Sequence, residues 1–487
     1  MSSFRVNNKS KEEIDRGNSS LAVKAGLWYV VSIFMVKAIA FITTPIFARL
    51  MSKADYGEFS NFASWQITLL IITSAELYNT VSRAYYDFKE DFDQYLSTIT
   101  LASCGITFFV YIFFLISHKF IFNIVSIPPR YIHLMFIVLL SQAVKQIYLA
   151  RERTLYRYKS VAALSFISLF IPTTIAIMAV FAFPDSDHLA LRLYGFFLPT
   201  AIIGALCAVP LLGHRRNFNW KHCKYAIVLS IPLLVHYLTT YLLSSTNIIV
   251  TKAVLGAEIA AIVSIANSTI HVVTVFFHAV SGALTTWLMD NLDQKQYNKV
   301  KKDSLFYVLL LAFCSIGVMM TAPEIVQMLG GHKYLISTIL IPGFVFAVFI
   351  QSITTLYTII LTYDKNIIKT ATFTGVVAVL SIFGKIFVLK LFGYHALPYV
   401  NITAFSILFM VNYFLVVKAG YAEAVNFRGI VAIILAMGVF MEGALLLYNY
   451  DTLRYNLIVV FLTILSIALY IKRNELIPFV KKIRKSK

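Results

Sequence analysis

The chain is dominated by uninterrupted apolar runs, each about as long as the hydrocarbon core of a membrane is thick. Segments such as FVYIFFLIS and LIVVFLTILSIALYI contain no charged residue. A hydrocarbon core about 30 Å thick needs roughly 20 apolar residues per helix. Hydrophobic residues make up 59% of the 487 residues and charged residues 13%, whereas soluble proteins are about 25% charged. With a mean hydropathy of +0.77, the sequence predicts an integral membrane protein.

These runs favour helices over barrel strands, which would give weakly alternating segments of about ten residues. We therefore predict an all-α polytopic membrane protein with about fourteen transmembrane helices. The expected spans are 25–48, 60–84, 97–117, 131–150, 161–183, 192–213, 225–250, 259–289, 305–322, 334–361, 370–391, 397–417, 429–448 and 455–471. The polar segment before the first span has no compact apolar region followed by a cleavage site, so no signal peptide is expected.

A faint internal repeat suggests how these spans are organised. LMSKADYGEFSNFAS follows the first span and VLGAEIAAIVSIANS follows the seventh, each as a short turn before a span rich in small residues. Parallel repeats of this kind place a substrate site between two halves. The expected parts are a cytoplasmic segment 1–24, an N-lobe of six helices at 25–213, a C-lobe of six at 225–417, two further helices at 429–471 and a basic cytoplasmic tail at 472–487.

Basic residues set the orientation, because loops rich in Lys and Arg stay cytoplasmic. RERTLYRYK, HRRNFNWKHCK, KQYNKVKK and the final KKIRKSK all fall on one side of the predicted membrane. Both termini are therefore predicted to be cytoplasmic. The net charge of +19 is explained by loops that face anionic lipid, and nucleic acid is not an expected partner because no basic soluble module is present.

No catalytic signature is found. The four cysteines are scattered without C-x-x-C spacing, and there is no Gly-rich phosphate loop, H-E-x-x-H or G-x-S-x-G motif. Two histidines seven residues apart in the eighth span lie about 10.5 Å apart along a helix, too far to share one metal ion. We expect neither a catalytic residue, nor a metal site, nor a cofactor; coupling to H⁺ or Na⁺ stays open.

Polar residues within the spans recur at helical spacing and so share helix faces, which we call polar stripes. The stripes are Glu76, Asn79, Thr80 and Arg83 in the second span, Gln142, Lys145 and Gln146 in the fourth, His236, Thr240, Ser244 and Asn247 in the seventh, Ser264, Asn267, Ser268, His271, Thr274 and His278 in the eighth, and Gln351, Thr355, Thr358 and Thr362 in the tenth. Such stripes act either as hydrogen-bonding contacts between helices or as the lining of a wet pathway. A charged side chain at a helix centre costs about 2.5–3.5 kcal/mol and normally marks a pathway. Lys37 could alternatively reach the interface or pair with Glu76. The predicted cavity residues are Lys37, Glu76, Arg83, Lys145, His236, Asn247, Asn267, His271, His278, Gln351 and Lys385.

Two motifs resemble those of a known family. FARLMSKADYGEF at Phe47 to Phe59, directly after the first span, is similar to the signature of polysaccharide-type lipid flippases, the Wzx-like branch of the multidrug/oligosaccharidyl-lipid/polysaccharide (MOP) exporter superfamily. TNIIVTKAVLGAEIAAIVSIAN at Thr246 to Asn267 is similar to the family's second-half element. Glu76 departs from the family, whose members often have an apolar residue or glycine there, so the resemblance lends no support to a cation-coupling role for Glu76.

The resemblance implies a transporter of two six-helix lobes in the inner membrane. Its implied cargo is an undecaprenyl-pyrophosphate-linked oligosaccharide for O-antigen or related polysaccharide assembly. Implied partners are this substrate, membrane lipids, and a polysaccharide polymerase and chain-length regulator in the same membrane. A cation-coupled multidrug antiporter of the same superfamily is the first alternative, although such an antiporter would need an acidic cavity and the charged residues within the spans are mostly basic. A polytopic glycosyltransferase is the second, although its outer loops would be longer.

The asymmetry of basic loops predicts which positions face the cytoplasm. Single cysteines at Asn217 and Asn298, introduced into a chain without its own cysteines, should be protected from a membrane-impermeant thiol reagent in intact cells. Cysteines in the turns Ser52–Glu58 and Lys252–Glu258 should be labelled. Labelling of position 217 or 298 from outside would overturn the orientation.

Overall fold

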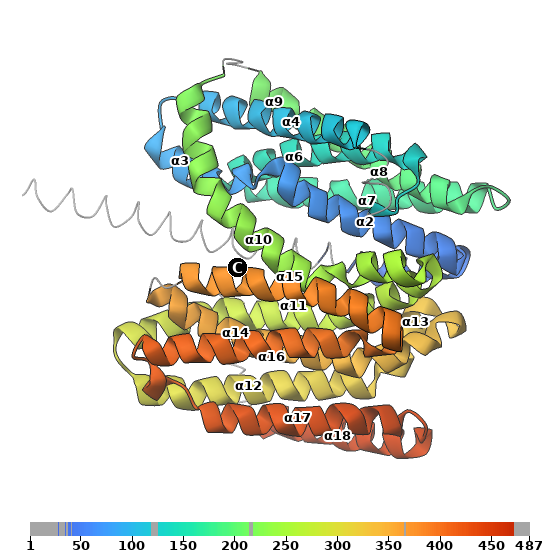
Figure 1. Ribbon diagram of the computed structural model, residues 1–487, viewed down its shortest axis with the longest axis vertical. Coiled ribbons are helices and arrows are strands. Elements are labelled where there is room, and N and C mark those ends of the chain that lie inside the picture. Colours follow the sequence, from blue (N-terminus) through green and yellow to red (C-terminus); the bar gives the residue numbers. More distant parts are fainter. Residues whose placement is uncertain are drawn as a thin grey trace, which may run out of the picture. The chain divides into compact units, whose positions relative to one another are not determined.

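The computed structural model describes residues 28, 35, 38, 39, 41–117, 125–213, 218–364 and 367–471. Within these ranges the secondary structure is helical and no strand is present (Figure 1). Eleven of the described helices are long and apolar enough to cross a membrane. This confirms the predicted all-α, multi-pass fold. The count of fourteen stays a prediction, because much of the first expected span, 25–48, lies outside the described residues.

Clustering of contacts divides the chain into two compact units. Unit 1 comprises residues 1–264 and 374–394, and unit 2 comprises residues 265–373 and 395–487. The helices that begin in unit 1 are α2 (Lys53–Ser74), η1 (Leu77–Thr80), α3 (Val81–Asp87), α4 (Phe92–Ile116), η2 (Pro129–Tyr131), α6 (Ile132–Thr154), α7 (Tyr158–Ala182), α8 (His188–Leu206), α9 (Ala208–Leu212), α10 (Trp220–Leu255) and α11 (Ala257–Asp293). The contact units do not test the predicted boundaries of the N-lobe at 25–213 and the C-lobe at 225–417, which stay a prediction.

The boundary between the two units falls inside two helices. α11 belongs to unit 2 from residue 265 onward, and α15 belongs to unit 1 from residue 374 onward. The helices that begin in unit 2 are α12 (Tyr297–Met320), α13 (Ala322–Gly330), η3 (His332–Leu340), α14 (Ile341–Tyr363), α15 (Ile367–Phe392), η4 (Tyr394–Ala396), α16 (Leu397–Lys418), η5 (Ala422–Ala424), α17 (Phe427–Leu447) and α18 (Asp451–Ile471). α14 runs alongside α16 (Figure 1), where Tyr357 stacks on Phe409 with centroids 5.4 Å apart.

The second expected span, 60–84, is broken. α2 ends at Ser74, and both Ala75 (φ 46°) and Glu76 (φ 55°) adopt the left-handed conformation. The chain then continues as the short 3-10 helix η1 and the separate helix α3. The break overturns the predicted single helix face of Glu76, Asn79, Thr80 and Arg83.

Tertiary packing explains why the sequence pattern missed this break. Ala and Glu are strong helix formers, and each left-handed residue costs roughly 1–2 kcal/mol. Downstream of the break, Leu77, Val81 and Ala84 are at most 1% exposed and join a core with residues of α4, α6 and α10. The burial of these three side chains offsets the conformational cost of the left-handed turn. The contacts that bury them come from distant parts of the sequence, so the local periodicity of a helix cannot reveal them.

The two motifs that suggested an internal repeat contact each other within unit 1. A Cβ atom on Gly57 would lie 1.8 Å from the carbonyl oxygen of Ala257, so the backbones touch there. Lys252 Nζ is 2.7 Å from a carboxylate oxygen of Glu58. α10 and α11 are joined by the single residue Gly256, whose φ of +89° favours glycine. The start of α2 is therefore fixed against the α10–α11 corner.

We predict that Gly57→Ala destabilises the protein. The added methyl group meets backbone atoms that cannot move aside, and overpacking typically costs about 1–3 kcal/mol. Gly105→Ala is the matched control, because a Cβ atom there meets nothing within 4 Å and alanine suits a helix better than glycine. Thermal unfolding of the purified protein in detergent measures both. Equal melting temperatures for the two variants would contradict the close approach.

Candidate functional site

The predicted cavity residues fall into three groups. Lys37 lies outside the described residues. Unit 1 contains Glu76, Arg83, Lys145, His236, Asn247 and Lys385. Unit 2 contains Asn267, His271, His278 and Gln351. Each unit is considered by itself below.

Unit 1 contains a cavity of about 310 Å³ that we call the polar cavity. It lies where α2 ends and is bordered by α2, η1, α6 and α10. Its polar lining includes Glu76, which was predicted as a site residue, together with Gln146 and Thr240, which the predicted polar stripes contain. The structure therefore brings one residue from each of three predicted polar stripes to one place. The complete lining is Ile67, Leu70, Ile71, Ser74, Glu76, Tyr78, Gln146, Tyr237, Thr240 and Tyr241.

Glu76 is the acidic group of the polar cavity and is only 3% exposed. Its Oε2 atom accepts a hydrogen bond of 2.6 Å from Asn79 Nδ2. Its backbone amide donates to Ser74 Oγ at 3.2 Å, which supports the left-handed turn. Within the described ranges Glu76 forms no ion pair. Lys37, the lysine that could pair with Glu76, lies outside the described residues, so this pairing stays a prediction.

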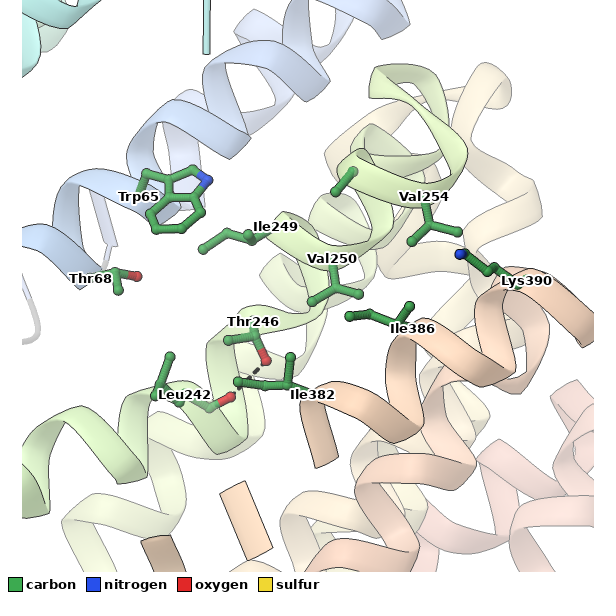
Figure 2. A pocket seen from close by; sticks show the side chains of 11 residues that line it. Trp65, Thr68, Leu242, Thr246, Ile249, Val250, Val254, Ile382, Ile386 and Lys390 are labelled. Carbon is green, nitrogen blue, oxygen red and sulfur yellow. Dashed lines mark hydrogen bonds between the residues drawn. The ribbon is translucent and has the colours of Figure 1, made fainter. Parts of the chain in front are cut away.

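A second cavity in unit 1, of about 510 Å³, is bordered by α2, α10 and α15, and we call it the apolar cavity. Figure 2 shows Trp65 and Thr68 on α2, a row of side chains on α10, and Ile382, Ile386 and Lys390 on α15. Branched aliphatic side chains form most of the wall. The ammonium group of Lys390 lies beside Val254 at one end of the cavity (Figure 2). The arrangement can hold a hydrocarbon chain beside a cation.

Lys385 is completely buried on α15. Its Nζ donates to the carbonyl oxygen of Leu243 at 3.0 Å and to Thr246 Oγ1 at 2.9 Å. Thr246 also lines the apolar cavity and donates its own hydroxyl to the carbonyl of Leu242 at 2.7 Å (Figure 2). The lysine thus joins α15 to α10 through neutral dipoles. No carboxylate pairs with it among the described residues.

The other predicted residues of unit 1 do not join these cavities. Arg83 is exposed and pairs with Asp87 at 3.4 Å. A hydrogen bond from Tyr225, with further support from Arg83, holds the pKa of the Asp87 carboxyl below its usual range. Lys145 is half-buried and has no ion pair in the described ranges.

His236 and Asn247 lie on α10, as predicted from one stripe, but differ in their surroundings. His236 is half-buried, and its backbone carbonyl accepts the hydroxyl of Thr240 at 2.8 Å. Asn247 is 1% exposed, and its Oδ1 atom has no hydrogen-bond partner among the described residues. Asn247 is therefore a buried group with unused hydrogen-bonding capacity.

In unit 2 the polar stripes bond mainly to their own helices. On α14 the hydroxyl of Thr355 donates to the carbonyl of Gln351 at 3.1 Å, and Thr362 donates to Thr358 at 2.7 Å. On α11, His271 and His278 are exposed within the described structure and Asn267 is half-buried. A contact between helices does occur where Asn412 of α16 donates to Thr358 Oγ1 at 3.2 Å.

Sequence reasoning missed several polar groups. Tyr78, Tyr237 and Tyr241 line the polar cavity. The segment LVHYLTTYLL could have pointed to Tyr237 and Tyr241, because tyrosine is an amphipathic group within a span. Lys390, near the end of the expected span 370–391, was not among the predicted cavity residues, yet it is the last-turn cation of α15 and lines the apolar cavity.

Arg192, the first residue of the expected span 192–213, was also not singled out by the sequence, yet it is 7% exposed and lies on α8. Its guanidinium carbon lies 3.5 Å from the ring centre of Phe59 and 4.0 Å from that of Phe47. These contacts arise from packing between helices and leave no trace in the local sequence.

Comparisons with known proteins relate this structure to membrane transporters. A family model described as polysaccharide biosynthesis protein matches residues 22–288, more than half of the chain. No curated protein sequence matches significantly. The solved structure of the lipid II flippase MurJ in an inward closed conformation is similar, with a TM-score of 0.67 and 14% identity over 92% of this chain and 99% of that chain.

Two solved structures, each described as a multidrug resistance MATE family transporter of the MOP superfamily, have the same fold. The inward-facing structure gives a TM-score of 0.60 at 11% identity, covering 79% of this chain and 95% of that one. The outward-facing structure gives 0.55 at 11% identity, covering 83% and 96%. At these identities the likeness shows the fold alone. Together with the family match, it confirms the resemblance drawn from the two sequence motifs.

The contacts of Lys385 predict how two substitutions differ. Lys385→Met fills the same volume and leaves no unpaired polar group, because Leu243 lies within a continuous helix and Thr246 bonds to Leu242. Replacing a buried charge by a well-packed apolar side chain is often neutral or stabilising. Lys385→Ala leaves a cavity and should cost about 2–5 kcal/mol. The melting temperatures of the two variants test this order of stability. An equal decrease of the melting temperature in both variants would show that the fold requires the charge of Lys385 itself.

Proposed function

Since the chain belongs to the polysaccharide biosynthesis protein family, we propose that it is a flippase for an undecaprenyl-pyrophosphate-linked oligosaccharide. It moves this unit of an O-antigen or related polysaccharide from the cytoplasmic to the periplasmic leaflet of the inner membrane. Transport proceeds by alternating access between inward-open and outward-open states. A polysaccharide polymerase and a chain-length regulator in the same membrane would act on the delivered unit.

The observation behind this proposal is that a member of a biosynthetic family consists almost wholly of membrane helices. Eleven of them are long enough to span, and the described ranges contain no folded domain outside the helices. The described ranges leave no room for an extramembrane reaction centre. Its contribution to polysaccharide synthesis is therefore best explained as movement of a lipid-linked intermediate, and the protein acts as a transporter rather than an enzyme.

The apolar cavity suits the two chemical parts of such a cargo. Its volume of about 510 Å³ lies within the range of about 300–1,000 Å³ that is usual for ligand pockets. The aliphatic wall matches an isoprenoid chain. Lys390 at its end offers a point charge to a phosphate group. On the predicted topology, Lys390 lies near the periplasmic surface, where the translocated diphosphate would arrive.

A cation-coupled multidrug antiporter is the alternative that shares this fold. An organic cation would be repelled by Lys390 and would need a carboxylate beside the apolar cavity. No acidic side chain lines that cavity among the described residues. The cargo chemistry therefore favours an anionic lipid over a cationic drug.

Complementation of a strain that lacks its own flippase tests this function. The wild-type chain should restore surface polysaccharide, and Lys390→Met should reduce it about tenfold, which corresponds to about 1.4 kcal/mol. Lys390→Arg should keep part of the activity because it retains the charge. Lys37→Ala should also lose export if Lys37 is a cavity cation, as its sequence position predicts.

Lys369→Met is the matched control, because Lys369 lies on the same helix, is exposed and is absent from the cavity lining. This variant should export normally at equal expression. The cargo is tested separately with proteoliposomes that contain either a fluorescent lipid-linked oligosaccharide or ethidium. Translocation of ethidium but not of the glycan lipid would replace the flippase by the antiporter.

A further inference from the structure

One side of α17, in unit 2, is left uncovered by the described part of the chain. α17 packs against α12, α14 and α18. The side chains that it buries are Ile430, Met437, Met441 and Ala444. On its other side, Leu435, Val439 and Leu446 are 66%, 76% and 66% exposed. At about 100° per residue, the buried and the exposed sets lie on opposite sides of the helix.

The exposed side has the spacing of two paired helices. Its residues follow one another at alternating steps of three and four: Ala432, Leu435, Val439, Glu442 and Leu446. We call these five exposed residues the α17 face. Such spacing is the a and d pattern by which one helix packs along another. In a membrane, helices associate through close packing and hydrogen bonds between them, because lipid is as apolar as the side chains.

Glu442 places a carboxyl group on the α17 face, inside a very apolar span. α17 has the highest mean hydropathy of the eleven candidate spans, 2.5. Glu442 is the only charged residue between Arg428 and Asp451, and it lies about 7.5 Å before the end of the helix at Leu447. Lysine and arginine reach the membrane surface through long apolar stems, whereas the side chain of glutamate is shorter. Ionisable groups inside spans normally have a protein partner.

The described chain satisfies only part of this carboxyl group. Tyr399, on α16, donates its hydroxyl to Glu442 Oε1 at 3.0 Å. Among the described residues, Glu442 forms no ion pair and no second hydrogen bond. The two oxygens of a carboxylate offer about four acceptor positions. The exposed carboxyl group therefore has hydrogen-bonding capacity that a neighbouring helix can use.

We propose that the α17 face is an interface with a second copy of this chain, in which two α17 helices pair in parallel and their Glu442 carboxyl groups share one proton. All copies insert with the same orientation, so a two-fold axis along the membrane normal brings each residue of the face to its own counterpart at the same depth. A protonated carboxyl group donates a hydrogen bond and an ionised one accepts it. The shared proton thus leaves one negative charge in the pair instead of two.

The second copy is favoured over a different partner because the chain itself supplies every matching feature. The face has its polar residue at a single position, and one polar residue in such a pairing surface fixes the register and the number of helices. In this arrangement, Glu442 finds a hydrogen-bonding partner at the same depth without a second kind of protein. The interface uses no residue that lines either cavity of unit 1, so it is independent of the proposed flippase function.

Cysteine cross-linking in native membranes tests the geometry. In a chain without its own cysteines, Val439→Cys and Leu446→Cys should form disulfide-linked dimers in the presence of copper phenanthroline. Met410→Cys is the matched control, because Met410 is 52% exposed near the middle of α16 but lies outside the α17 face. Equal dimer yields at positions 410 and 439 would indicate random collisions and would contradict the interface.

Energy transfer between donor-labelled and acceptor-labelled full chains in liposomes tests the role of the carboxyl group. Dilution with lipid gives the dissociation constant of the wild-type dimer. Glu442→Leu should weaken the dimer about tenfold, whereas Glu442→Gln should keep it, because amide groups also bond to each other across helices. Glu423→Leu is the matched control, since Glu423 is an exposed acid in η5 outside the α17 face, and it should dimerise like the wild type.

A second variant serves if Glu442→Leu does not fold. A Cβ atom at Gly443 meets nothing within 4 Å in this chain, so Gly443→Leu should keep the melting temperature of the monomer in detergent. Its side chain would stand beside the α17 face and should weaken the dimer by holding the helices apart. A wild-type chain that stays monomeric at high protein-to-lipid ratio, or a dimer that both variants leave unchanged, would overturn the proposal. Cross-links from position 439 to a different membrane protein, without any to a second copy, would also overturn it.

Discussion

Hydrocarbon offers no hydrogen bonds, so each polar group in a membrane span must find its partner within the protein. Much of this structure follows from that constraint. On α2, Ser60 donates to the carbonyl of Tyr56 at 2.8 Å, and Ser64 donates to that of Ser60 at 2.8 Å. Such bonds satisfy a hydroxyl within its own helix. A polar stripe therefore need not mark a pathway, and the α14 stripe, which bonds in the same way, is explained without one.

The two buried charges of unit 1 meet the constraint differently. Lys385 donates to two neutral oxygens of α10 and leaves no group unpaired there. Glu76 accepts hydrogen bonds from Asn79 and Tyr78 and lines a cavity. The first charge is part of the packing between α10 and α15, and the second is balanced by the described residues only in part. Burial alone does not separate these roles, because both side chains are at most 3% exposed.

Apolar length was enough to predict the fold class, because a span leaves a signal in composition that tertiary contacts do not alter. The seventh-span stripe was also correctly placed on one continuous helix, α10. The α2 break was not predictable, since Ala75 and Glu76 favour helix locally and the compensating burial of Leu77 comes from distant segments. For the same reason, sequence placed Arg83 beside Glu76 in a cavity, whereas it lies exposed beside Asp87.

Lys385 also bears on how the chain enters the membrane during synthesis. A lysine at the centre of a span opposes insertion by about 2.5–3.5 kcal/mol, so α15 is a poor insertion signal by itself. Its two acceptors lie 142 and 139 residues earlier in the chain, at Leu243 and Thr246. The ribosome therefore completes α10 well before Lys385 emerges, and the translocon releases α15 into a bilayer that already holds its hydrogen-bond acceptors. Because α10 precedes α15 in the sequence, the hydrogen-bond acceptors of Lys385 are in the membrane before Lys385 itself.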